Sequence, residues 1–116
     1  MRKDRSERRR VMIHVDFEKY SALMAEDKPV LLEYWAPWCV YCRRIASALE
    51  AVATQQADNL VVGQVNIDDV PELAQKENID VIPTLILYRK GEKLGSIVAP
   101  DSKAKIDAFI LETLKG

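Results

Sequence analysis

The sequence contains two cysteines, Cys39 and Cys42, with only Val40 and Tyr41 between them. Cysteines at this spacing can form and break a disulfide bond reversibly, because a thiolate attacks a disulfide sulfur and exchanges partners with it. A bond between them would close almost no loop, so it would stabilise the fold little by restricting the unfolded chain. We therefore expect the pair to carry redox chemistry rather than to staple the structure.

The segments on either side predict a strand before the pair and a helix after it. Residues 30–35 form an apolar run that is typical of a buried strand. Apolar side chains then recur at helical spacing, at Ile45, Ala48, Leu49 and Val52. Free N–H groups at a helix N-terminus favour a thiolate. Cys39 is therefore the predicted attacking sulfur, and Cys42, one turn further in, is predicted to attack Cys39 and release reduced substrate.

Other uses of a cysteine pair are weaker interpretations. A structural zinc site needs four ligands, and this chain has no further cysteine and a single histidine, His14. We therefore expect no metal and no other cofactor within one chain. A metal cluster shared between two chains, and a pair of inert buried cysteines, stay open as alternatives.

The composition is that of an ordinary one-domain globular protein. The chain has 116 residues, of which 48% are hydrophobic and 30% charged, with a net charge of −1. This balance does not indicate a nucleic-acid partner. No stretch approaches the roughly 20 apolar residues that span a membrane, so we expect no membrane association.

The first residues differ from the rest. Residues 1–10 contain six Lys/Arg against two Asp/Glu, and we expect residues 1–11 to be a disordered basic leader ahead of a domain at 12–116. No apolar signal-peptide core follows Arg10, because His14 and Asp16 interrupt it. The expectation is a cytoplasmic protein, most simply a monomer.

The remaining pattern predicts alternating strands and helices. Strands are expected at 12–15, 30–35, 60–66, 84–88 and 92–98, with a hairpin turn at Lys90-Gly91. Helices are expected from an Asp16 N-cap to about 25, from the cysteines to about 56, at 71–77, and after Ser102. The first helix is expected to carry Phe17, Tyr20 and Met24 on one face. This order predicts an α/β protein with a mixed parallel and antiparallel sheet.

Four segments carry a family resemblance over roughly residues 12–115. They are Glu33-Tyr34-Trp35-Ala36-Pro37-Trp38-Cys39, Val65-Asn66-Ile67-Asp68, Ile82-Pro83-Thr84 and Tyr88-Arg89-Lys90-Gly91. With the order of elements, they resemble the thioredoxin family. The resemblance implies the thioredoxin fold, a five-stranded mixed sheet flanked by four helices. It also implies a cytoplasmic thiol–disulfide oxidoreductase that reduces disulfide-containing proteins and is recharged by a thioredoxin reductase. The alternative is a redox-sensing binding module of the same fold with little turnover.

The resemblance also assigns a substrate-binding surface. Pro83 is expected to be cis and to lie beside the cysteines, which leaves the backbone of Ile82 free to pair with an extended substrate. Trp38 and the Val40-Tyr41 dipeptide are expected to contact partners. Ala99 stands where a glycine lines the docking groove in the family. Val40-Tyr41 replaces the usual Gly-Pro, so this dipeptide is expected to influence redox potential and partner choice.

Glu33 is the one carboxylate inside the apolar 30–35 run. If buried, its pKa rises, and it is predicted to accept the proton of Cys42 during the second attack. The family usually has aspartate there, and often a lysine where this chain has Gln64, so Glu33 is expected to be harder to ionise. Trp35 is expected to support the cysteine turn from the core.

Overall fold

The computed structural model describes residues 12–115; the predicted leader at 1–11 lies outside them. Its strands are β1 (Met12–His14), β2 (Val30–Trp35), β3 (Val61–Asn66), β4 (Thr84–Arg89) and β5 (Glu92–Val98). Its helices are α2 (Phe17–Met24), α3 (Val40–Gln55), α4 (Pro71–Lys76) and α5 (Lys103–Lys115). The predicted order of elements is confirmed, and each boundary lies within one or two residues of its expected place.

The strands form one five-stranded sheet in the order β1-β3-β2-β4-β5. β1, β3 and β2 are parallel, whereas β4 and β5 run antiparallel to their neighbours. The parallel strands need helical crossovers, while β4 and β5 need only a hairpin. That hairpin turns at Lys90 and Gly91, both with positive φ, as a tight two-residue turn requires. The predicted mixed sheet is confirmed.

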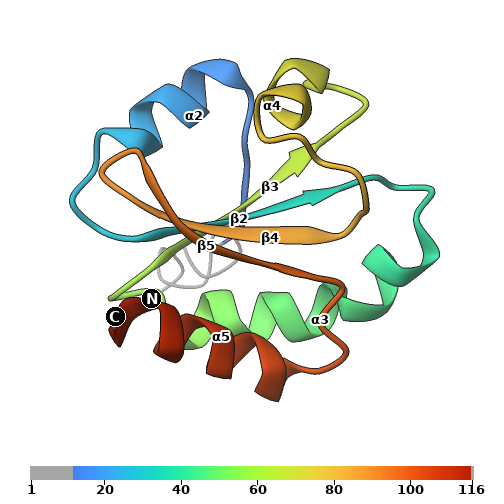
Figure 1. Cartoon of the computed structure of the whole chain (residues 1–116). Coiled ribbons are helices and arrows are strands. Elements are labelled where there is room, and N and C mark those ends of the chain that lie inside the picture. The colour runs from blue at the N-terminus through green and yellow to red at the C-terminus, as the bar shows by residue number, and fades with distance from the viewer. Residues whose placement is uncertain (1–11, 116) are drawn as a thin grey trace, which may run out of the picture.

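Two layers of helices cover the sheet, with α2 and α4 on one face and α3 and α5 on the other (Figure 1). Because side chains alternate along a strand, β2 sends Leu32 and Tyr34 toward α2 and α4, and Leu31 toward α3 and α5. Glu33 shares the parity of Leu31. It therefore faces the layer that contains the cysteine-bearing helix.

The first helix begins where the sequence predicts. Asp16 caps α2 by accepting a hydrogen bond from the Lys19 N–H at 2.8 Å. Phe17 stacks on the Tyr20 ring, so these two side chains share a face as predicted. Tyr20 and Leu23 are buried, whereas Phe17 stays 59% exposed.

A buried tyrosine pair links the sheet to α4. Tyr88 donates to Glu77 Oε2 at 2.9 Å, and the Tyr34 and Tyr88 hydroxyls lie 2.7 Å apart. Glu77 caps the end of α4 and also lies 3.7 Å from Lys93. This network fixes the end of α4, from which the chain continues toward Ile82.

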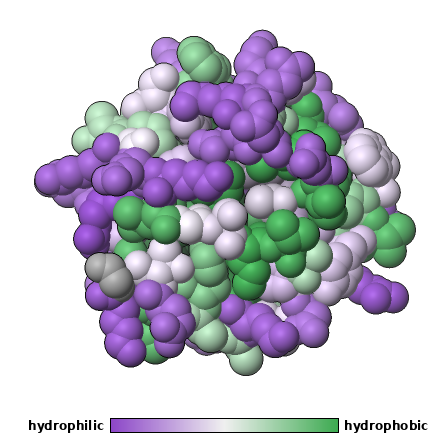
Figure 2. Space-filling view, viewed as in Figure 1, coloured by the Kyte–Doolittle hydropathy of each residue, from purple (hydrophilic) through white to green (hydrophobic). Residues whose placement is uncertain are grey.

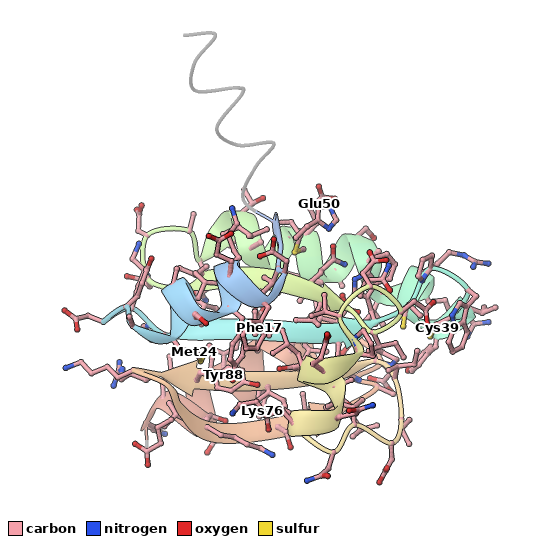
Figure 3. The ribbon with its side chains drawn as sticks, turned by 90° about the horizontal axis from the view of Figure 1, so that it is seen from above. Phe17, Met24, Cys39, Glu50, Lys76 and Tyr88 are labelled. Atoms are coloured by element: carbon pink, nitrogen blue, oxygen red, sulfur yellow. The ribbon has the colours of Figure 1, made fainter. Side chains whose placement is uncertain are left out.

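Cys39 lies at one end of the sheet, well separated from the Phe17, Met24 and Tyr88 side chains over its middle (Figure 3). β2 ends and α3 begins at this place. No helix within residues 12–115 is long and apolar enough to cross a lipid bilayer.

Candidate active site

The cysteine turn joins the end of β2 to the first turn of α3. Cys39 is the N-cap residue of α3, and its Sγ accepts a hydrogen bond from the Cys42 backbone N–H at 3.1 Å. An N–H group directed at sulfur, at the positive end of a helix dipole, stabilises negative charge that develops there. Both thiols are free, and they are brought together as predicted. Cys39 therefore has the surroundings of an attacking thiolate.

Cys42 lies deeper than Cys39, with 2% of its surface exposed against 8%. Burial, the contact with Cys39 and the nearby charge of Glu33 together raise the pKa of Cys42 to about 12. The Cys42 thiol therefore stays protonated near neutral pH. Its reaction requires a group that takes the proton away.

Glu33 is the carboxyl group that faces this layer, and it is 1% exposed. Burial raises its pKa from 4.5 to about 7, although a hydrogen bond from Gln64 lowers it. Gln64 lies opposite Glu33 on β3, and its Nε2 donates to Glu33 Oε1 at 2.9 Å. Glu33 Oε2 has no hydrogen-bond partner among the described residues. The predicted burial of Glu33 is present, and Gln64 lies beside it.

The burial of Glu33 predicts a dependence of stability on pH. Between pH 4.5 and about 7 the unfolded chain releases this proton while the folded protein keeps it. The unfolded state then binds fewer protons, so the free energy of unfolding falls as pH rises through this window. Glu33→Gln removes the free-energy cost of ionising this buried carboxyl group. Relative to wild type, we expect the variant to gain about 3 kcal/mol of stability between pH 4.5 and pH 8.

Chemical denaturation at pH 4.5 and pH 8 measures this difference. Glu50→Gln, which neutralises an exposed carboxylate on α3, is the matched control and should show no such change. Equal stability gains for Glu33→Gln at the two pH values would contradict a buried carboxyl with a raised pKa.

The loop before β4 lies against the cysteines. The Ile82–Pro83 peptide bond is cis, as the resemblance implied. Cys39 Sγ donates a long contact of 3.9 Å to the Ile82 carbonyl oxygen, and Pro83 O accepts from the Ala99 N–H at 2.8 Å. The loop before β4 therefore meets the Cys39 sulfur, and the residue after β5 is bonded to that loop.

The dipeptide between the cysteines divides its side chains between two directions. Val40 points outward and is 60% exposed. Tyr41 is half-buried, and its hydroxyl donates to the Ala99 carbonyl oxygen at 3.2 Å. Ala99 adopts φ +47°, a conformation that favours glycine. The sequence predicted that Tyr41 and Ala99 share the substrate-binding surface, and the structure brings the two into contact.

The two tryptophans separate as the sequence predicted. Trp38 is 63% exposed. Trp35 is half-buried and packs against Ala36 and the cysteines.

Two hydrogen bonds near the cysteine turn were not predicted from the sequence. Trp38 Nε1 donates to Asp68 Oδ2 at 2.8 Å, and Arg43 donates to the Pro37 carbonyl at 3.0 Å. Asp68 belongs to a segment that carries the resemblance, and that was the available clue. Nothing in the local pattern around Arg43 indicates its bond to Pro37. Among the described residues, no three His, Cys, Asp or Glu side chains gather as a metal site requires.

Comparisons with known proteins found a family model, related sequences and a solved structure that match this chain. A family model described as Thioredoxin matches residues 11–112. The thioredoxin of Mycobacterium bovis is 38% identical over 84 residues, which cover 72% of each chain. A bifunctional thioredoxin reductase/thioredoxin of Mycobacterium leprae is 34% identical over 91 residues, 78% of this chain and 20% of that protein. The solved structure of a Malassezia sympodialis thioredoxin (Mala s 13) has a TM-score of 0.78 at 25% identity, covering 87% of this chain and 90% of that one.

Proposed function

Because the chain belongs to the thioredoxin family, we propose that Cys39 attacks the disulfide bond of a protein substrate and that Cys42 then releases the reduced substrate. Family membership makes the chain a thiol–disulfide oxidoreductase of the protein-disulfide reductase type. The observation that carries the assignment of roles is the Cys42 N–H directed at Cys39 Sγ, with the Cys42 thiol buried behind it.

The reaction proceeds by two exchanges. The Cys39 thiolate attacks one substrate sulfur, the substrate S–S bond breaks, and the other substrate sulfur leaves as a thiolate that takes a proton from water. A mixed disulfide now joins Cys39 to the substrate. The Cys42 sulfur, after losing its proton, attacks Cys39 Sγ and expels the second substrate thiolate. The substrate gains two electrons, and Cys39 and Cys42 end as a disulfide.

Glu33 is proposed to accept the Cys42 proton in the second exchange. Its burial on the α3 side of the sheet and its unpartnered Oε2 support this role. A base with a pKa of about 7 is ionised above that pH and can take a proton. The rate of the second exchange should therefore rise between pH 6 and 8 and then level off.

Glu33→Gln tests the role kinetically. We expect it to slow the second exchange at pH 8 on the order of 10²-fold and to abolish the plateau. The second release of thionitrobenzoate from 5,5′-dithiobis(2-nitrobenzoate) (DTNB) measures this step, because the first release reports the attack by Cys39. A first release slowed as much as the second would assign Glu33 to structure instead.

The proposed partners are disulfide-containing proteins and a thioredoxin reductase. The Mycobacterium leprae relative, which by name combines a thioredoxin reductase with a thioredoxin, supports a reductase as the electron donor. The chain is further proposed to act as a monomer in the cytoplasm, where reducing equivalents for such a cycle are available. Size-exclusion chromatography with light scattering tests the monomer; a stable dimer would contradict it.

Insulin reduction tests the proposed function as a whole. Wild-type protein with NADPH and a bacterial thioredoxin reductase should reduce insulin and consume NADPH in proportion. Activity with dithiothreitol but not with several thioredoxin reductases would overturn the proposed donor. Inactivity with both donors would overturn protein-disulfide reduction and favour a binding module.

A further inference from the structure

The Tyr41 side chain connects the cysteine-bearing helix to the loop after β5. Its hydroxyl donates to the Ala99 carbonyl at 3.2 Å, across 58 positions of sequence. The N–H of Ala99 is also occupied, because it donates to Pro83 O. Both backbone polar groups of Ala99 are therefore already bonded within the protein.

The backbone groups of Ile82, by contrast, make almost no hydrogen bonds to the described residues. Its carbonyl accepts only the 3.9 Å contact from Cys39 Sγ. Its N–H donates no hydrogen bond to any described residue. An extended polypeptide can therefore pair with the backbone of Ile82 in the loop before β4. Pro83 has no N–H, and Pro83 O accepts from the Ala99 N–H, so the neighbouring acceptor is the Ala99 carbonyl, to which Tyr41 donates.

Exposed apolar side chains lie beside Ile82 in the sequence, beside Cys39 in the sequence and at the end of β5. Val81 and Val98 are each 52% exposed, and Val40 is 60% exposed. Figure 2 shows apolar side chains across the middle of the face along which β5 runs. The surface next to Ile82 can therefore contact the side chains beside a disulfide without using the Ala99 carbonyl.

We propose that Tyr41 is a specificity-determining residue: by donating to the Ala99 carbonyl, it takes one of the two lone pairs of that oxygen and weakens a backbone anchor that extended polypeptides would use. The inference rests on the proposed function. Compact disulfides, those of small molecules or of protruding sites on folded proteins, need only Ile82 and Cys39 and are reduced about as well as disulfides within extended segments. The residues that flank a disulfide in an extended segment add little binding.

A matched pair of substrates tests this directly. One is the disulfide dimer of an unstructured peptide with a central cysteine, and the other is the dimer of N-acetylcysteine methylamide, the same disulfide without flanks. Wild-type protein should reduce both with similar kcat/KM. Tyr41→Phe frees the Ala99 carbonyl and should lower KM for the peptide dimer between about 2-fold and 10-fold, the range for one hydrogen bond. The ratio of its kcat/KM for the peptide dimer to that for the flankless dimer should rise by the same factor.

Tyr20→Phe is the matched control, because it removes a tyrosine hydroxyl from α2, on the face of the sheet opposite the cysteine-bearing helix. It should leave the ratio of the two kcat/KM values unchanged. A Tyr41→Phe variant that changes both substrates by the same factor, or neither, overturns the inference and assigns Tyr41 to redox tuning or stability. A wild-type protein that reduces neither dimer overturns the proposed function, and the inference with it.

Discussion

Replacing Cys39 with serine is expected to reduce insulin reduction to the uncatalysed rate, a loss of at least about 10³-fold. Serine keeps the N-cap acceptor for the Cys42 N–H, so the turn should keep its shape. An alcohol is not a thiolate, however, and cannot form the mixed disulfide. The variant therefore removes the chemistry while leaving the fold.

Circular dichroism and thermal unfolding should show that Cys39→Ser folds like wild type. Ser47→Ala, on the exposed side of α3, serves as the control and should keep full activity. Insulin reduction by Cys39→Ser at more than a tenth of the wild-type rate would show that Cys42 can attack substrate unaided. The assignment of roles would then be wrong.

Replacing Cys42 with serine is expected to leave the first exchange intact and to block the second. The mixed disulfide at Cys39 then accumulates, and only external dithiol can release it. Loss of the intramolecular attack should lower steady-state insulin reduction by at least about 10²-fold, because millimolar dithiothreitol is a poor substitute for a neighbouring thiol. Non-reducing electrophoresis should show a protein–substrate adduct that dithiothreitol cleaves.

The single-turnover rate of adduct formation separates the two steps. For Cys42→Ser it should stay within about 3-fold of wild type, since the Cys42 backbone N–H that contacts Cys39 is retained. An adduct that fails to form would mean that the Cys42 side chain itself activates Cys39. An adduct that resolves as fast as in wild type would exclude Cys42 as the resolving group.

The order of elements and the cysteine chemistry were predictable from local pattern. The apolar run around Glu33 predicted its burial, because a strand buried on both faces leaves no exposed position for a carboxylate. Helical periodicity placed Phe17 on the face of Tyr20, but it does not give how far the core extends, and Phe17 stays exposed. The cis bond at Pro83 was predicted from the family resemblance rather than from periodicity.

Contacts between distant segments were beyond the reach of local pattern. Tyr41 meets the Ala99 carbonyl over 58 positions, and Trp38 meets Asp68 over 30. Each bond depends on how two separate loops lie at the end of the sheet, which packing of the whole chain decides. The resemblance placed Tyr41 and Ala99 on one surface, but only the structure shows that the Tyr41 hydroxyl donates to the Ala99 carbonyl.

The position of the first covalent adduct shows directly whether Cys39 is the attacking sulfur. Reduced Cys42→Ser and Cys39→Ser proteins are each mixed with an equal amount of DTNB, quenched in acid, and mapped by mass spectrometry. We expect rapid release of one thionitrobenzoate and a label on Cys39 in Cys42→Ser, with negligible labelling of Cys39→Ser over the same time. A label on Cys42 of Cys39→Ser that forms as fast as the label on Cys39 would contradict the claim that Cys39 is the attacking sulfur.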